Sequence, residues 1–167
     1  MIPKAFFVTG GRAVSKVSGL NAFDMALKGA GVEQCNLVPV SSIIPPGCEE
    51  IEYRKLPVGA VTFVVLSKAG GRGEAVTAGI AWGRDEASGY GVVAEAYGRM
   101  DEAAVKKSLD ARIGEMAKIR NLKLVNVKQR TETINAPKGC FGCAVVVLVY
   151  VFLPRSHEST DLSSRSG

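Results

Sequence analysis

The sequence predicts an α+β protein in which β-sheets stack on one another and helices lie outside them. The runs 61–66 and 144–153 are almost entirely apolar and do not alternate with polar residues, which is typical of strands buried on both faces. Helical periodicity is evident in one long segment, residues 101–120, and in a shorter one that begins at Asn21. Many buried strands and few helices together favour stacked sheets.

In chain order, a first strand is predicted over residues 4–9, before a pair of glycines, and residues 12–20 show no periodic pattern and indicate a loop. Asn21 is a suitable N-cap for the short helix, which glycines terminate. The run 36–44 is of strand type and ends at Pro45-Pro46, where two successive residues lack a backbone N–H.

The second half of the chain completes the sheets around the long helix. That helix should bury a stripe made of Val105, Leu109, Ile113 and Met116. The remaining strands are predicted at residues 59–67, 74–83, 90–98, 122–134 and 144–153. We expect one domain over residues 1–153 and a flexible Ser/Thr-rich tail over residues 154–167.

Composition and charge narrow the class of protein. The 21 Lys and Arg residues exceed the 16 Asp and Glu residues and give a net charge of +5. These cations are scattered, so a solvated surface is favoured over a nucleic-acid interface. The apolar segment near the N-terminus is too short for a signal peptide, and the longest apolar run is about half of a membrane span. We therefore expect a cytoplasmic protein without membrane or nucleic-acid partners.

Cys140 and Cys143 have the C-x-x-C spacing of a redox pair or of half a metal site. A closed zinc site needs a second pair of ligands, and only the distant Cys35 and Cys48 or the lone His157 are available. We therefore expect no metal, and we interpret most of the cysteines as small buried residues.

Ser41 and Ser42 lie side by side in the apolar run before Pro45-Pro46. The Ser42 hydroxyl could attack the Ser41 carbonyl and shift the acyl group from nitrogen to oxygen. The resulting ester can eliminate to dehydroalanine, which hydrolyses to a pyruvoyl group. The ordinary alternative is a capped strand that leaves for a loop.

Three blocks in order resemble one known family: Leu20 to Asp24, Asn36 to Gly47 and Val92 to Gly98. They are similar to those of the pyruvoyl-dependent arginine decarboxylases, and the resemblance covers most of residues 5–150. It implies a four-layer αββα sandwich of two mainly antiparallel sheets. It also implies self-cleavage between Ser41 and Ser42, which gives chains 1–41 and 42–167.

The resemblance further implies that a pyruvoyl group derived from Ser42 forms a Schiff base with L-arginine and releases CO2 and agmatine for polyamine synthesis. The pyruvoyl group takes the role that pyridoxal phosphate has elsewhere, so neither that cofactor nor a metal is expected. The family assembles as trimers with active sites between protomers. We therefore expect a homotrimer of cleaved protomers.

Glu95 is the expected proton donor. Val93, Glu95 and Tyr97 share one face of a strand, where apolar neighbours would favour the protonated carboxyl group. The alternative is an edge glutamate in water. Asn36, which the resemblance assigns to processing and positioning, shares a face with Ser42 six residues later, so direct contact needs a bend or a neighbouring subunit. Its alternative role is a turn at the strand start.

The resemblance pairs Asp24 with the substrate guanidinium, and Leu20 and Phe23 could wall the same pocket. Asp24 could also serve the dipole or cap of its own helix. Two other functions stay open: decarboxylation of a different amino acid, and an unprocessed, non-enzymatic scaffold or nucleic-acid-binding domain.

Overall fold

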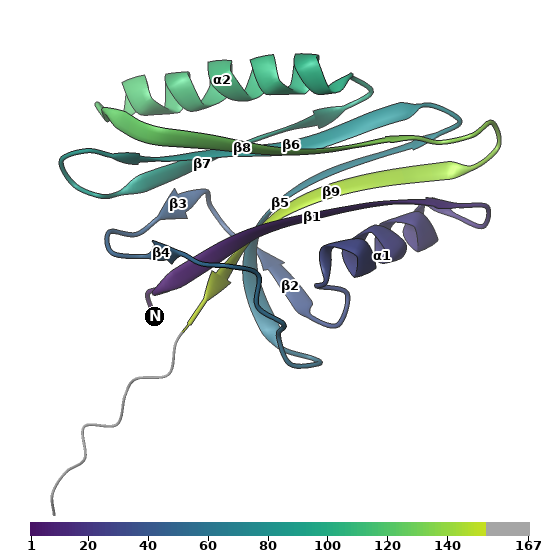
Figure 1. Ribbon diagram of the computed structural model, residues 1–167, viewed down its shortest axis with the longest axis horizontal. Coiled ribbons are helices and arrows are strands. Elements are labelled where there is room, and N and C mark those ends of the chain that lie inside the picture. Colours follow the sequence, from purple (N-terminus) through teal and green to yellow (C-terminus); the bar gives the residue numbers. More distant parts are fainter. Residues whose placement is uncertain (153–167) are drawn as a thin grey trace, which may run out of the picture.

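A computed structural model of the protein describes residues 1–152, which form two β-sheets and two helices (Figure 1). This confirms the α+β class. The tail predicted at 154–167 and the last residue of the strand predicted at 144–153 lie outside the described residues. Neither described helix is both long and apolar enough to cross a membrane. The elements are β1 (Ala5–Ser15), α1 (Gly19–Ala30), β2 (Asn36–Pro39), β3 (Ile43–Ile44), β4 (Glu49–Glu50), β5 (Val61–Arg72), β6 (Ala75–Asp85), β7 (Gly91–Gly98), α2 (Glu102–Ile119), β8 (Leu124–Asn135) and β9 (Phe141–Val151).

The two sheets differ in strand direction. The five-stranded sheet has the order β2-β5-β9-β1-β4, and the four-stranded sheet has the order β3-β7-β6-β8. The four-stranded sheet is antiparallel throughout. The five-stranded sheet is mixed, because the short strands β2 and β4 run parallel to β5 and β1. The expected antiparallel pairing therefore holds for the longer strands and not for these two.

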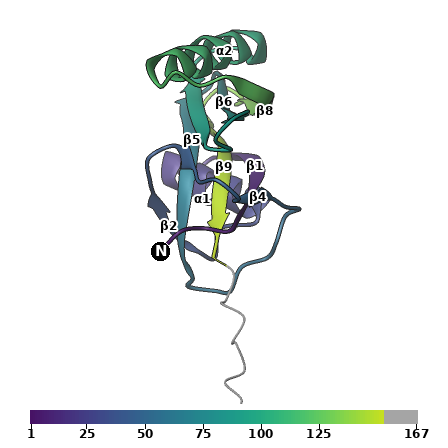
Figure 2. The ribbon, with the colours of Figure 1, turned by 90° about the vertical axis from the view of Figure 1, so that its left-hand side faces the viewer.

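Each helix covers the outer side of one sheet, as Figures 1 and 2 show. The buried alanines of α1 pack on β1, β5 and β9, whereas Val105, Leu109 and Ile113 of α2 pack on β6 and β7. Between the two sheets lies a further hydrophobic cluster, which includes Phe6, Leu148 and Trp82. The predicted stripe of the long helix is confirmed, although Met116 is only partly buried.

β9 is the central strand of the five-stranded sheet and is covered on both faces. Val145, Val147 and Val149 face α1, and Val146 and Leu148 face the four-stranded sheet. The prediction from its continuous apolar sequence is confirmed. Burial of both faces explains why alternation with polar residues is missing.

The prediction that the first strand stops before Gly10 and Gly11 is wrong, because β1 continues to Ser15. A Cβ atom at Gly11 would lie 2.1 Å from the carbonyl oxygen of Ala26. The glycine therefore permits α1 to lie directly on the strand. A residue type that usually interrupts a strand serves here as a helix-packing site.

The predicted N-cap of α1 is also wrong by one turn. Ser18 is the cap, and its hydroxyl oxygen accepts the backbone N–H of Asn21 at 3.1 Å. Asp24 consequently lies beyond the first helical turn, where it does not complete a capping arrangement. The helix ends at Gly31, which has a left-handed φ of 73°.

The strand predicted over residues 36–44 is divided between the two sheets. β2 pairs with β5, and its last ladder contact is the Val40 N–H to the Val64 carbonyl oxygen. Ile43 and Ile44 then pair with β7 of the other sheet. The chain therefore crosses from one sheet to the other at Ser41 and Ser42.

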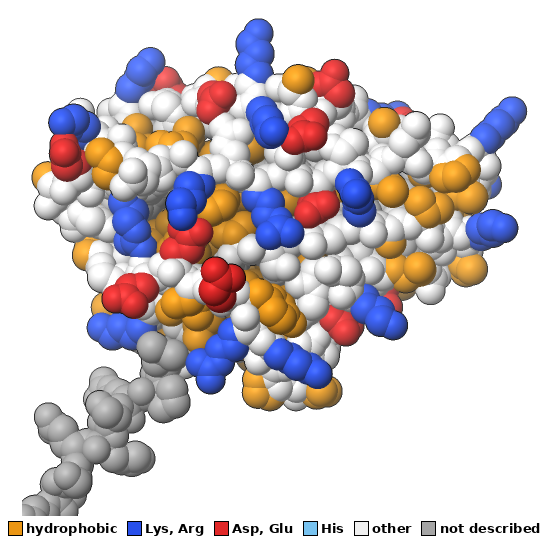
Figure 3. All heavy atoms as spheres, viewed as in Figure 1, with side chains coloured by type: hydrophobic (Ala, Val, Ile, Leu, Met, Phe, Trp, Pro, Cys, Tyr) orange, Lys and Arg blue, Asp and Glu red, His pale blue; other side chains and the backbone are white. Residues whose placement is uncertain are grey.

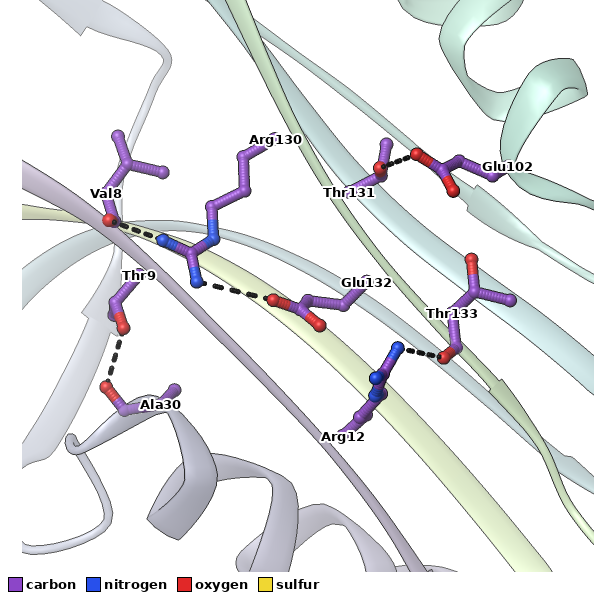
Figure 4. Close-up of polar contacts among 9 residues, drawn as sticks. All are labelled: Val8, Thr9, Arg12, Ala30, Glu102, Arg130, Thr131, Glu132 and Thr133. Carbon is purple, nitrogen blue, oxygen red and sulfur yellow. Dashed lines mark hydrogen bonds and ion pairs between the residues drawn. The ribbon is translucent and has the colours of Figure 1, made fainter.

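The stacked sheets have two opposite edges that differ in how the sheets are connected. We call the edge formed by β2, β3, β5 and β7 the crossover edge, and the edge formed by β1, β4 and β8 the ion-pair edge. At the ion-pair edge Arg130 donates to the Val8 carbonyl oxygen, and Arg12 donates to that of Thr133 (Figure 4). Figure 3 shows basic and acidic side chains interspersed over this face.

Candidate active site

Ser41 and Ser42 form a tight turn between the sheets. The Ile43 N–H donates to the Ser41 carbonyl oxygen at 2.9 Å, a bond that closes a three-residue γ-turn with Ser42 at its centre. The Ser42 carbonyl oxygen accepts the Val93 N–H at 3.0 Å. Ser41 is exposed and Ser42 is half-buried. The turn thus presents the Ser42 side chain at the crossover edge while β7 holds its backbone.

Ser42 and Glu95 line one pocket of about 430 Å³ between β7 and α2. Both are predicted site residues, separated by more than fifty positions in the chain. The pocket also has apolar walls, and its lining comprises Ser42, Val93, Ala94, Glu95, Tyr97, Arg112, Glu115, Met116 and Ile119. A hydroxyl group and a carboxyl group therefore share a site of the size that a small molecule needs.

Burial raises the pKa of Glu95 above its ordinary value, although the nearby Arg112 guanidinium opposes the shift. Arg112 donates to the backbone carbonyl oxygen of Glu95 at 2.5 Å. Desolvation disfavours the charged carboxylate, so the protonated form persists to higher pH than in an exposed glutamate. This is the property that a proton donor requires.

Asn36 lies outside this pocket. It is exposed at the start of β2, and its side-chain amide donates to the Gly59 carbonyl oxygen at 3.0 Å. The chain does bend between Asn36 and Ser42, but the bend does not bring Asn36 into the lining of the Ser42 pocket. Its assignment to processing stays a prediction, beside an observed contact at the strand start.

The predicted substrate residues Leu20, Phe23 and Asp24 also lie elsewhere, on α1 over the five-stranded sheet. Leu20 is 76% exposed, and Asp24 is exposed as well. The ammonium group of Lys68 lies 3.9 Å from the centre of the Phe23 ring. One face of this ring therefore already carries a cation.

A family model described as "Pyruvoyl-dependent arginine decarboxylase" matches residues 5–154. The chain belongs to this family. The match spans all three sequence blocks on which the resemblance was based, and that prediction is confirmed. The family name includes a pyruvoyl group, and position 42 suits one, because β7 holds the backbone of Ser42 and the residue lines a pocket.

Curated relatives agree with the family match. The chain is 36% identical over 149 residues to the pyruvoyl-dependent arginine decarboxylase of Methanopyrus kandleri, an alignment that covers 89% of this chain and 97% of the relative. It is 34% identical over 150 residues to pyruvoyl-dependent arginine decarboxylase 1 of Methanosarcina acetivorans, covering 85% and 83%. It is 41% identical over 115 residues to pyruvoyl-dependent arginine decarboxylase 2 of Archaeoglobus fulgidus, covering 62% and 70%.

Sequence reasoning missed two side chains beside the turn. Arg112 lies on the exposed side of α2 and contacts Glu95, and Tyr150 of β9 donates to the Ile43 carbonyl oxygen at 2.6 Å. Tyr150 and Ile43 are 107 positions apart in the chain, so no local pattern could have indicated the contact. Tyr150 lies in a valine-rich apolar run, and this pattern predicts burial but no specific contact.

Proposed function

We propose that this protein decarboxylates L-arginine to agmatine and CO2 in the cytoplasm, with a pyruvoyl group that it makes from its own Ser42. Membership of the pyruvoyl-dependent arginine decarboxylase family supports the reaction. The observation that carries the assignment of residues is the pocket shared by Ser42 and Glu95. Neither pyridoxal phosphate nor a metal is needed for this chemistry.

Maturation begins with attack of Ser42 Oγ on the Ser41 carbonyl carbon. The new C–O bond replaces the C–N bond, and the hydroxyl proton ends on the released Ser42 amine. Loss of the Ser42 α-proton then breaks the Cβ–Oγ bond and frees the Ser41 carboxylate. Water converts the remaining dehydroalanine to the pyruvoyl group and ammonia. The small chain is 1–41 and the large chain is 42–167.

Each residue of the site has a separate task in the mature enzyme. The pyruvoyl group supplies a carbonyl system that takes up the electron pair released with CO2. Glu95 holds the proton that the reaction must return to the substrate carbon, and its half-buried position at the pocket wall keeps this proton in place. The apolar side chains in the pocket wall, Val93 and Met116 among them, reduce the contact of the reacting atoms with water.

Asp24 binds the substrate guanidinium through charge-assisted hydrogen bonds, with Leu20 and Phe23 along the aliphatic part. These residues lie on α1 and outside the pocket of Ser42 in the same protomer. A complete site therefore combines α1 of one protomer with the crossover edge of another. We accordingly propose a homotrimer with sites between protomers, each protomer having the αββα order of the family, and with Asn36 assisting cleavage from its place on β2.

Intact mass spectrometry of the purified protein tests this proposal without added substrate. We expect two chains split between Ser41 and Ser42, with a pyruvoyl group at the start of the larger one. The Ser42→Ala variant should remain a single chain of 17.6 kDa, because it lacks the attacking hydroxyl. Wild-type protein that also stays in one piece would refute the proposed maturation.

A further inference from the structure

The peptide between Ser42 and Ile43 is held on both of its sides. Its carbonyl oxygen accepts the Val93 N–H at 3.0 Å, and its N–H donates to the Ser41 carbonyl oxygen at 2.9 Å. Both groups belong to one planar unit, so fixing the carbonyl also fixes the direction of the N–H. The bond from β7 therefore aims the Ile43 N–H at the carbonyl that self-cleavage attacks.

Tyr150 fixes the next peptide. Its hydroxyl reaches from β9, in the five-stranded sheet, and donates to the Ile43 carbonyl oxygen at 2.6 Å. Tyr150 is 5% exposed and packs in the cluster between the sheets. Burial raises the pKa of its hydroxyl above the ordinary value, so the group keeps its proton and remains a donor. A short bond from a buried side chain gives the Ile43 backbone little freedom.

The chain after Ser42 is held more firmly than the chain before it. Ile44 is fully buried, and Arg84 donates to the carbonyl oxygens of Pro45 and Cys48. Val40 and Ser41 are exposed. The groups that can orient the reacting peptide therefore come from the downstream side, and Tyr150 is the side chain that contacts the turn most directly there.

We propose that Tyr150 is a positioning residue for self-cleavage: by fixing Ile43, it holds the Ile43 N–H as the donor to the oxyanion that forms on the Ser41 carbonyl oxygen. This inference rests on the proposed maturation. When Ser42 Oγ bonds to the Ser41 carbonyl carbon, the C=O electron pair moves to the oxygen that already accepts the Ile43 N–H. Collapse of this adduct breaks the C–N bond and leaves the ester. A donor in place before reaction stabilises the developing charge without reorganisation.

The chain of bonds adds to this effect. The Val93 N–H polarises the Ser42–Ile43 peptide, whose N–H then donates more strongly to the Ser41 oxygen, because hydrogen bonds in series reinforce one another. Tyr150 holds the same residue from the opposite sheet. One backbone N–H is thereby positioned by both sheets at the place where the chain crosses between them.

The test compares Tyr150→Phe with a matched control, Tyr53→Phe. Tyr53 also donates its hydroxyl to a backbone carbonyl oxygen, that of Gly31 at 3.1 Å, but it lies away from the turn. Full-length wild-type protein and both variants are made by cell-free translation, and uncut chain is followed by intact mass spectrometry. We expect cleavage of Tyr150→Phe to be about tenfold slower, because loss of one hydrogen bond to Ile43 leaves the oxyanion donor less well held. Tyr53→Phe should match wild type.

Hydroxylamine separates a defect in ester formation from a defect in the later elimination, because it cleaves the ester as soon as the ester forms. We expect it not to restore the wild-type rate in Tyr150→Phe, since the ester itself forms slowly. Restoration of that rate would place the defect in elimination and overturn the inference. Equal cleavage rates in wild type, Tyr150→Phe and Tyr53→Phe would also overturn it, and would leave the proposed function standing. Absence of cleavage in wild type would overturn both.

Thermal unfolding of uncleaved proteins removes the remaining ambiguity. Each variant is combined with Ser42→Ala, so that all samples are single chains. We expect the two tyrosine variants to unfold at temperatures within a few degrees of each other. A much lower midpoint for the Tyr150→Phe protein would assign its slow cleavage to lost stability and would overturn the positioning role.

Discussion

At the crossover edge the two sheets are joined by the chain itself, whereas at the ion-pair edge they are joined by side chains. Ser41 and Ser42 carry the backbone from β2 to β3 at the first edge. At the second, Glu50 of β4 accepts from Trp82 at 3.1 Å and from Lys128 at 3.0 Å. One edge therefore places a tight backbone turn and Ser42 next to a pocket. The other edge is held by charged side chains, and two of these, Glu50 and Lys128, line a separate pocket.

The contrast between the two edges shows where chemistry can be placed on such a fold. Exposed strand edges invite unwanted pairing, and charged side chains at the ion-pair edge discourage it. At the crossover edge, by contrast, backbone groups of β7 and of the Ser41–Ile43 turn hydrogen-bond to one another. Tyr97, beside the pocket, is 54% exposed there. We infer that substitutions at the crossover edge affect reactivity, while those at the ion-pair edge affect stability slightly.

The largest effect is expected for Glu95→Gln. Decarboxylation should fall by about 100- to 10,000-fold, because the amide cannot donate the proton. Self-cleavage should proceed, as Glu95 has no part in the attack of Ser42. The protonated form of Glu95 is lost as pH rises through its raised pKa, so activity of the wild type should fall on the alkaline side of that pKa. A pH–rate profile measures this limb.

The Glu95→Gln variant provides its own check. Its residual activity should lack the alkaline limb, because the residue that titrates is gone. If the same limb persists in the variant, another group donates the proton, and the catalytic role assigned to Glu95 at the crossover edge would be wrong.

Asp24→Asn is expected to have the next largest effect, a loss of about 100-fold in kcat/KM for arginine, since the guanidinium loses its charged partner. Co-expression with Ser42→Ala tests whether α1 of one protomer completes the crossover edge of another. Random mixing of the two inactive chains leaves about a quarter of the sites with both residues intact.

Recovery of activity in the mixture, measured as CO2 release, supports sites between protomers. A mixture as inactive as its parts would contradict them and would require Asp24 and Ser42 to act within one chain. Each parent variant, expressed alone, is the control for contamination.

The smallest effect is expected at the ion-pair edge. Glu50→Gln keeps a hydrogen-bond acceptor for Trp82 and removes the charge that pairs with Lys128. Because both side chains of this pair are partly exposed to solvent, stability should fall by less than about 1 kcal/mol, and self-cleavage should be unchanged. Chemical denaturation of Glu50→Gln in the uncleaved Ser42→Ala background measures the change in stability. Intact mass spectrometry of Glu50→Gln alone measures self-cleavage. Slower cleavage would show that the two edges are coupled.

Much of the fold could be predicted from the sequence because burial determines where apolar residues stand along the chain. The stripe of α2 and the continuous apolar run of β9 both gave the right element and the right environment. The errors fell where tertiary contacts override local preference. Gly11 continues a strand because α1 lies on it, and the strand over residues 36–44 divides because β7 offers Ile43 and Ile44 a partner.

The site was predicted in part, for a related reason. Ser42 and Glu95 stand in recognisable blocks, and the structure places them in one pocket. Arg112 and Tyr150 act through contacts with backbone carbonyls far away in the chain, which no spacing reveals. The separation of Asp24 from Ser42 depends on how α1 packs, and that too is absent from the local sequence.

The position of the crossover also determines how the two chains of the proposed mature protein are held together and how they could refold. Residues 1–41 contribute only β1, α1 and β2, all associated with the five-stranded sheet, and β1 lies between β9 and β4 with eleven residue pairs to β9. The proposed cut after Ser41 would leave this segment paired in the sheet of the large chain while removing the covalent link. Refolding from two separate chains is then a bimolecular event that depends on concentration. Under the proposed maturation the chain therefore has to fold before it is cut, and the cut protein no longer has a unimolecular route back from the unfolded state.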